Sequence, residues 1–84
     1  MSTAIKSKHP RDIFNELKWK DDLDINECSI EYIHRGAPGN TKKVSGEDIE
    51  DIGHSFFTVT PDTMIPYHRI LKIKYKGEVI YVKN

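Results

Sequence analysis

Residues 67–83, YHRILKIKYKGEVIYVK, carry the strongest fold signal in this chain. Leu71, Ile73 and Tyr75 alternate with lysines, and a period of two is typical of a strand with one buried face. The glycine at position 77 separates this run from a second apolar run, EVIYV. We therefore predict an antiparallel hairpin with strands over residues 67–76 and 78–83.

Residues 10–20 predict one helix near the N-terminus. Pro10 suits the first helical position, because its missing N–H would have no partner there, and it favours an extended, capping His9. Apolar residues at positions 10, 13, 14 and 17 then form one helical face. Residues 21–27 are polar and are expected to connect the helix to the first strand.

Shorter segments complete the predicted fold. We expect a strand at 28–35, a loop at 36–40, a helical turn at 45–48, a strand at 55–60 and a turn at 60–62. These elements predict an α+β fold, with one N-terminal helix packed on a small, mostly antiparallel sheet that can curl toward a barrel. Cys28 shares a strand face with Ile30 and is expected in the core.

Length and composition narrow the class of protein. Eighty-four residues favour a single domain over 1–84, with a shallow surface site. Thirteen basic and thirteen acidic residues give zero net charge, which argues against a protein that coats nucleic acid along many phosphates. One cysteine excludes an internal disulfide framework, and no apolar run matches a membrane span, so the sequence favours a cytoplasmic protein. Since no histidine or cysteine has metal-ligand spacing, we expect no metal and no cofactor.

The zero net charge hides blocks of opposite sign. Residues 34–45 carry three net positive charges and residues 63–84 carry four, whereas residues 21–33 and 46–62 each carry five negative charges. Each positive block contains a His-Arg pair. If folding brings these blocks together, a neutral protein has a local basic patch. The alternative is a solvated surface on which the acidic blocks neutralise their neighbours.

The first His-Arg pair lies in YIHRGAPG, residues 32–39. Tyr32 and His34 leave the predicted strand on one side, just before a loop whose amides at Gly36 and Gly39 can approach an anion. Arg35 adds a planar guanidinium that suits two oxygens of one phosphate. The alternative is a hairpin turn with an ordinary surface pair.

The second pair lies in MIPYHRI, residues 64–70, where Tyr67, His68 and Arg69 repeat the combination of an aromatic ring, a histidine and an arginine. His68 either contacts a ligand, or it is partly buried and holds the strand in place by a hydrogen bond to the backbone. Trp19, between two lysines at the end of the predicted helix, either stacks a base or packs half-buried.

These two motifs, with HPRDIFNELKW at 9–19 and the segment from GEDI to FF at 46–57, resemble a small family found in archaea and, fused to other domains, in eukaryotes. This family is the RNA 2′,3′-cyclic-group end recognition domain. The resemblance covers about residues 8–82. It implies an RNA-binding module that recognises RNA 3′ ends carrying a 2′,3′-cyclic or terminal phosphate. We expect no catalytic residues, because no third residue is spaced to orient His34 or His68.

Such a site needs a compact anion pocket and an aromatic platform, not a long basic groove. Arg35 and Arg69 suit phosphate oxygens, and His34 and His68 suit the cyclic oxygens. The amides of Gly36–Gly39 complete the pocket, and Tyr32, Tyr67 or Trp19 stacks the terminal base. Contact with about two phosphates predicts a salt slope of roughly −1.4, and a slope of about −4 or steeper would contradict this hypothesis.

Two rival functions stay open. A small phosphoesterase would use His34 and His68 as general acid and base to open a cyclic phosphate, which a turnover assay would detect. A protein-interaction module would use the apolar C-terminal hairpin as a sheet edge, pairing with a second copy or with an RNA-processing enzyme. Gel filtration across concentration tests the homodimer.

Overall fold

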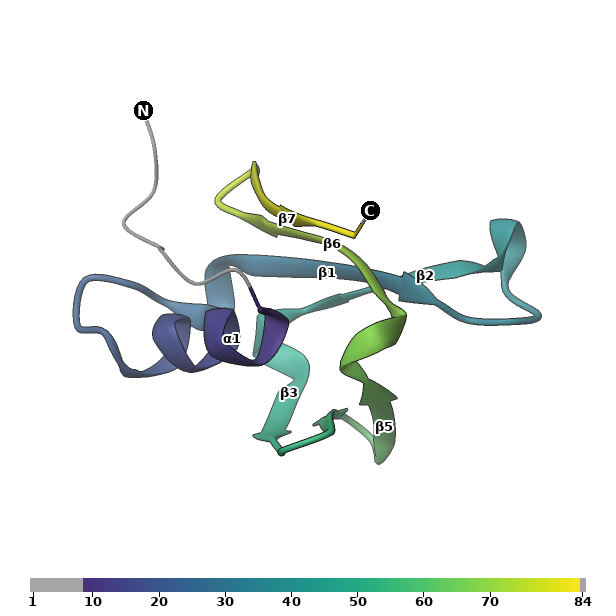
Figure 1. Cartoon of the computed structure of the whole chain (residues 1–84), viewed down its shortest axis with the longest axis horizontal. Helices are drawn as coiled ribbons and strands as arrows, with labels where there is room; N and C mark the ends of the chain where they lie inside the picture. The colour runs from purple at the N-terminus through teal and green to yellow at the C-terminus, as the bar shows by residue number, and fades with distance from the viewer. Residues whose placement is uncertain (1–8, 84) are drawn as a thin grey trace.

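The helix forms where its cap and its apolar face predict it. In the computed structural model, which describes residues 9–83, α1 spans Pro10–Trp19 (Figure 1). His9 is extended at the N-cap, and its Nδ1 accepts a hydrogen bond of 3.4 Å from the Arg11 amide. The apolar face, which includes Phe14, is buried. The predicted helix is therefore confirmed, and it ends one residue earlier than expected.

Strands and short 3-10 turns follow α1 through the described residues. The strands are β1 (Cys28–Ile33), β2 (Thr41–Ser45), β3 (Ile49–Ile52), β4 (Phe56–Val59), β5 (Thr63–Pro66), β6 (Ile70–Tyr75) and β7 (Glu78–Val82). The turns are η1 (Ile25–Glu27), η2 (Pro38–Asn40), η3 (Gly46–Asp48) and η4 (Tyr67–Arg69). The predicted α+β class is confirmed.

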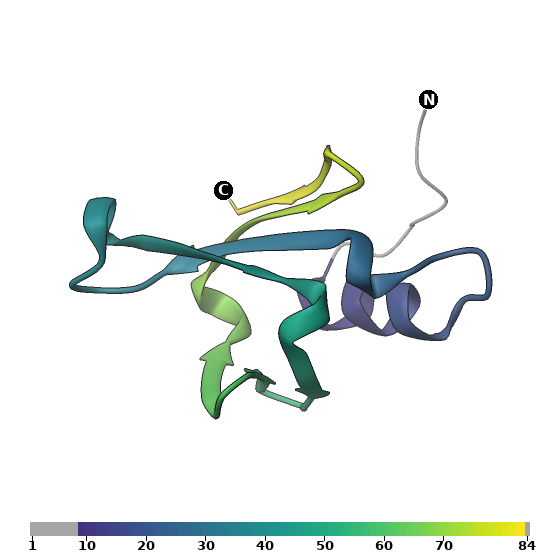
Figure 2. The ribbon, with the colours of Figure 1, turned by 180° about the vertical axis from the view of Figure 1, so that it is seen from behind.

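The strands form two antiparallel sheets where one was expected. The four-stranded sheet has the order β2-β1-β6-β7, and the three-stranded sheet has the order β3-β4-β5. Figures 1 and 2 show, from opposite directions, that α1 and the three-stranded sheet lie on the same side of the four-stranded sheet. Neither sheet closes into a barrel, and no described element covers the other face of the four-stranded sheet.

The core lies between the four-stranded sheet and the two elements beneath it. Phe14 meets Phe57 edge to face, with 5.0 Å between ring centroids, and Phe57 stacks on Tyr67 at 5.6 Å. These rings join α1, β4 and η4. Cys28 is 2% exposed, which confirms its predicted place in the core.

The C-terminal hairpin is confirmed, but its first strand starts late and contains a bulge. Residues 67–69 form η4, so β6 begins only at Ile70. The pairing of β1 with β6 shifts so that Tyr32 lies opposite Ile70, and Leu71 is skipped. Ile70, and not Leu71, is therefore buried with the alternating apolar residues of this strand.

Other boundaries differ for local reasons. The strand predicted to reach residue 35 ends at Ile33, because the His34 amide donates to the Asn40 carbonyl and its own carbonyl accepts from the Ala37 amide. The helical turn expected at 45–48 and the strand expected at 55–60 are confirmed as η3 and β4. Strands β2, β3 and β5 were not predicted, since each has only four or five residues with no clear alternation.

Two expectations concern parts of the chain beyond the described residues. The expected absence of a membrane span and the expected single domain over 1–84 both include residues 1–8 and residue 84. Both stay predictions. Between residues 9 and 83, no helix has the length and hydropathy needed to cross a bilayer.

Candidate functional site

A surface cavity lies where the end of β1 meets β5 and η4. Its volume is about 190 Å³. It is lined by Tyr32, Ile33, His34, Thr63, Met64, Ile65, Pro66 and Arg69. The fold thus brings together the two His-Arg motifs, which lie about thirty residues apart in the chain. We call this cavity the β1–β5 pocket.

The polar side of the β1–β5 pocket consists of His34, Arg69 and Tyr32. His34 and Arg69 are both exposed to solvent. The Tyr32 ring is buried and lies edge-on to the His34 ring, with 6.2 Å between the centroids. Burial raises the pKa of the Tyr32 hydroxyl, which therefore stays protonated near neutral pH. No described residue hydrogen-bonds this hydroxyl, and it is not among the fully buried polar atoms, so it is available to a ligand.

The apolar side of the β1–β5 pocket continues onto the outer face of the three-stranded sheet. Met64 lines the pocket and is 55% exposed. Phe56, which is 39% exposed, pairs across β4 and β5 with Pro66, another pocket residue. Phe56 is thus an aromatic surface beside the pocket that the sequence reasoning missed. The signal was available, because a strand through Phe56 and Phe57 must turn one of these rings outward.

The backbone hydrogen bonds of the loop after β1 join its residues to one another. The Ala37 amide donates to the His34 carbonyl at 3.2 Å, and the Asn40 amide donates to the Ala37 carbonyl at 2.8 Å. Because Pro38 has no N–H, the amides of Gly36 and Gly39 are the ones within residues 36–40 that remain for an anion. Arg35, Gly36 and Gly39 do not line the β1–β5 pocket. The structure therefore separates the predicted loop site from the pocket that begins at His34.

Tyr67 and His68 lie outside the β1–β5 pocket. Tyr67 is 6% exposed, and its hydroxyl donates a hydrogen bond of 2.7 Å to the Gly53 carbonyl. Burial raises the pKa of Tyr67 to about 12, so this donor stays protonated. His68 is exposed, and its carbonyl accepts a hydrogen bond from the Lys83 ammonium. Of the YHR triplet, only Arg69 lines the pocket.

Trp19 lies at the C-terminal end of α1 and is 72% exposed. The Lys18 ammonium lies over its ring, 5.3 Å from the ring centroid. The end of α1 and the turn between β1 and β2 lie at opposite ends of the molecule (Figure 1). Trp19 and the β1–β5 pocket are therefore separate surfaces.

Cys28 offers no reactive thiol. Burial raises the pKa of its thiol to about 12, so the nucleophilic thiolate is not formed near neutral pH. Residues 9–83 hold no group of three or more histidine, cysteine or carboxylate side chains arranged to bind a metal ion.

The fold and the pocket together define a small α+β domain with a shallow surface pocket, polar on one side and apolar on the other. A family model described as the MJ1316 RNA cyclic group end recognition domain matches residues 8–83, and the chain belongs to this family. The resemblance seen in the sequence is thereby confirmed.

Curated relatives of this chain include proteins of several archaea. A UPF0248 protein of Archaeoglobus fulgidus is 37% identical over 67 residues, which cover 80% of this chain and 94% of the relative. UPF0248 protein MJ1316 of Methanocaldococcus jannaschii is 37% identical over 76 residues, covering 88% and 92%. A UPF0248 protein of Methanococcus vannielii is 40% identical over 75 residues, covering 87% and 89%. No solved structure matches the chain significantly.

Proposed function

We propose that this domain binds the 3′ end of RNA in the β1–β5 pocket and prefers an end that carries a 2′,3′-cyclic phosphate or a terminal phosphate. The observation that carries this proposal is the meeting of His34 and Arg69, from two distant motifs, in one surface cavity. The description of the family supports RNA as the ligand.

Different residues of the pocket are suited to different parts of the RNA end. The Arg69 guanidinium can take two phosphate oxygens at once, since its N–H donors form a planar fork. His34 and the protonated Tyr32 hydroxyl are suited to the ring oxygens of the cyclic phosphate. The apolar surface of Met64 and Phe56 is suited to the ribose and the terminal base.

The arrangement favours binding without turnover. Opening a cyclic phosphate by general acid-base catalysis requires one group that removes a proton and another that donates one. His34 lines the pocket, whereas His68 does not, so the two histidines of the phosphoesterase hypothesis do not face one ligand there. We therefore propose that the RNA end is held unchanged.

The test is a titration with short RNAs that differ only at the 3′ end. We expect the tightest binding for the 2′,3′-cyclic phosphate, weaker binding for the 3′-phosphate and the weakest for the 3′-hydroxyl. For the shortest RNAs the salt slope should be roughly −1.4, as for contact with two phosphates. Each RNA is recovered for mass analysis. Equal affinity for the three ends would overturn end recognition, and ring-opened product would make the domain an enzyme.

The edge strand β7 supports a second proposal, association through the C-terminal hairpin. β7 has a neighbour on one side only in its sheet, and Val79 and Val82 are 45% and 53% exposed. Such an edge can pair with a second copy or with an RNA-processing enzyme. For the homodimer, the elution volume in gel filtration should fall as protein concentration rises. A concentration-independent monomer would exclude it.

A further inference from the structure

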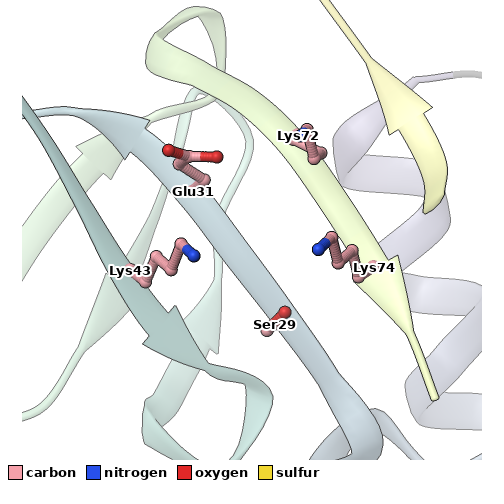
Figure 3. A pocket seen from close by; sticks show the side chains of 5 residues that line it. All are labelled: Ser29, Glu31, Lys43, Lys72 and Lys74. Carbon is pink, nitrogen blue, oxygen red and sulfur yellow. The ribbon is translucent and has the colours of Figure 1, made fainter. Parts of the chain in front are cut away.

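The uncovered face of the four-stranded sheet carries a second cavity, which we call the lysine cavity. Its volume is about 70 Å³, and it is lined by Ser29, Glu31, Lys43, Lys72 and Lys74 (Figure 3). These residues come from the three adjacent strands β2, β1 and β6. The lysine cavity therefore lies on the opposite side of this sheet from α1 and the core.

Strand register explains why the lysines gather. Glu31 lies opposite Lys43 on one side and opposite Lys72 on the other, and Ser29 lies opposite Lys74. Residues paired across neighbouring strands point to the same face, so three ammonium groups share a surface with one carboxylate. The lining has a net charge of +2 in a protein whose net charge is zero.

No carboxylate of the described residues forms an ion pair with these lysines. Among the described residues, none of the three has a carboxylate oxygen within 4.0 Å. Figure 3 shows Lys43 and Lys74 extending their ammonium groups toward each other across β1, with the Ser29 hydroxyl between the two strands that carry them. Lys43 and Lys74 lie on strands that flank β1, so their like charges repel one another, and an anion placed between them removes that repulsion. Two ammonium groups and a hydroxyl are donors suited to phosphate oxygens.

The lysine cavity and the β1–β5 pocket approach each other at the end of β1, although the pocket is lined mainly by residues on the other side of the four-stranded sheet. Ser29 and Glu31 line the first, and Ile33, two residues further along the same face of β1, lines the second. At a rise of about 3.3 Å per residue, Ser29 and Ile33 are roughly 13 Å apart. A few nucleotides of single-stranded RNA cover such a distance.

We propose that the lysine cavity binds internal phosphates of the RNA strand whose 3′ end occupies the β1–β5 pocket. This inference rests on the proposed function for the identity of its ligand. The RNA strand then passes around the end of β1 at Ile33, beyond the last residue that pairs with β6, and continues along the outer face of the sheet. Lys43 and Lys74 hold its backbone without reading the bases. The domain engages several nucleotides of the RNA and not the terminal one alone.

The experiment compares a dinucleotide with an octanucleotide, both ending in a 2′,3′-cyclic phosphate, across a series of salt concentrations. The double variant Lys43→Gln, Lys74→Gln removes two charges of the cavity. The matched control Lys18→Gln, Lys20→Gln removes two charges at the far end of α1, where Lys20 pairs with Glu16 at 3.0 Å. An octanucleotide with a 3′-hydroxyl separates backbone binding from end binding.

We expect the cavity variant to flatten the octanucleotide salt slope by about 1.4, since each phosphate contact on a single strand contributes roughly 0.7. Over a fourfold range of salt this difference changes the relative affinity about sevenfold. Dinucleotide binding should not change, and the control variant should retain the wild-type slope. An unchanged octanucleotide slope in the cavity variant, or an equal loss in the control, would overturn the inference.

The two proposals fail in different ways. If the cyclic-end preference persists while the cavity variant has no effect, the lysine cavity is not an RNA site. If the cavity variant weakens octanucleotide binding while cyclic and hydroxyl ends bind equally, the lysine cavity stands and end recognition fails. If no RNA binds the wild-type protein, both are wrong.

The variant Glu31→Gln is expected to strengthen octanucleotide binding, whereas the cavity variant weakens it. Removing the carboxylate between two lysines removes repulsion toward phosphate, so octanucleotide affinity should rise severalfold while dinucleotide affinity stays the same. A surface that only balances charge within the fold would show no change in RNA affinity. Reduced octanucleotide binding would also contradict the proposal.

Discussion

The Arg69→Ala variant is expected to lose the preference for a cyclic RNA end. Arg69 is the arginine that lines the β1–β5 pocket, and its loss removes a charge-assisted contact to phosphate. Contacts of this kind stabilise a complex by about 1.5–3 kcal/mol, which corresponds to a roughly 10–150-fold loss of affinity. Because Arg69 is exposed and lies in η4, the fold should tolerate the change.

Arg35→Ala is the matched control. It also removes one exposed arginine, and Arg35 directly follows the pocket residue His34, but it does not line the pocket. We expect its effect to be small and similar for cyclic and hydroxyl ends. Titration of both variants with both ends gives the comparison. If Arg35→Ala erased the preference and Arg69→Ala did not, the end would bind at the glycine loop and not in the β1–β5 pocket.

The Gly46→Ala variant is expected to lower the free energy of unfolding more than alanine at any other glycine of this domain. A Cβ atom at Gly46 would lie 1.8 Å from the Ile25 carbonyl oxygen and 2.7 Å from the Cys28 sulfur. The oxygen belongs to the backbone of η1, so no side-chain rotation can relieve the clash. Overpacking of this kind costs about 1–3 kcal/mol and occasionally more, out of a total stability of roughly 4–13 kcal/mol for 84 residues.

Position 46 matters because the chain passes there from one sheet to the other. Gly46 begins η3, between β2 of the four-stranded sheet and β3 of the three-stranded sheet. Displacing η3 would also displace the three-stranded sheet, which carries one wall of the β1–β5 pocket. We therefore expect reduced RNA binding together with a lower midpoint in urea.

Gly77→Ala is the control for this prediction. Gly77 has a φ of +85°, but no atom lies within 4 Å of its would-be Cβ, so only backbone strain of about 1–2 kcal/mol is expected. Urea unfolding of the two variants separates a steric clash from conformational strain. Equal stability of Gly46→Ala and the wild type would show that η1 and η3 are not packed as described.

The local elements of this domain follow from short-range rules. Pro10 with His9 and an apolar face is enough to predict α1, because a helix is specified by residues within two turns of one another. The C-terminal hairpin is predicted in the same way, by alternation around a glycine. Leu71 was assigned to the buried face, and Ile70 takes that place, because the bulge arises from pairing with β1 and not from β6 itself.

At the candidate site, too, the sequence predicted the motifs and the tertiary structure decided which of their residues come together. The sequence could not decide between Arg35 and Arg69 as the phosphate ligand, or between His34 and His68, because both motifs contain a histidine followed by an arginine. Tyr67 and Trp19 were both candidate platforms, whereas the structure buries Tyr67 in the core, leaves Trp19 at the far end of α1 and exposes Phe56 beside the pocket.

The sequence by itself determined the α+β class, the helix, the C-terminal hairpin and the two motifs, and it was sufficient to indicate the family. Only the tertiary structure decided that the strands divide into two sheets, and that His34 and Arg69 share one pocket. It also gathered three lysines from β2 and β6 on one open face. The reason is that strand pairing joins residues that are distant in the chain, and a register shift of one residue moves a side chain to the opposite face of a sheet.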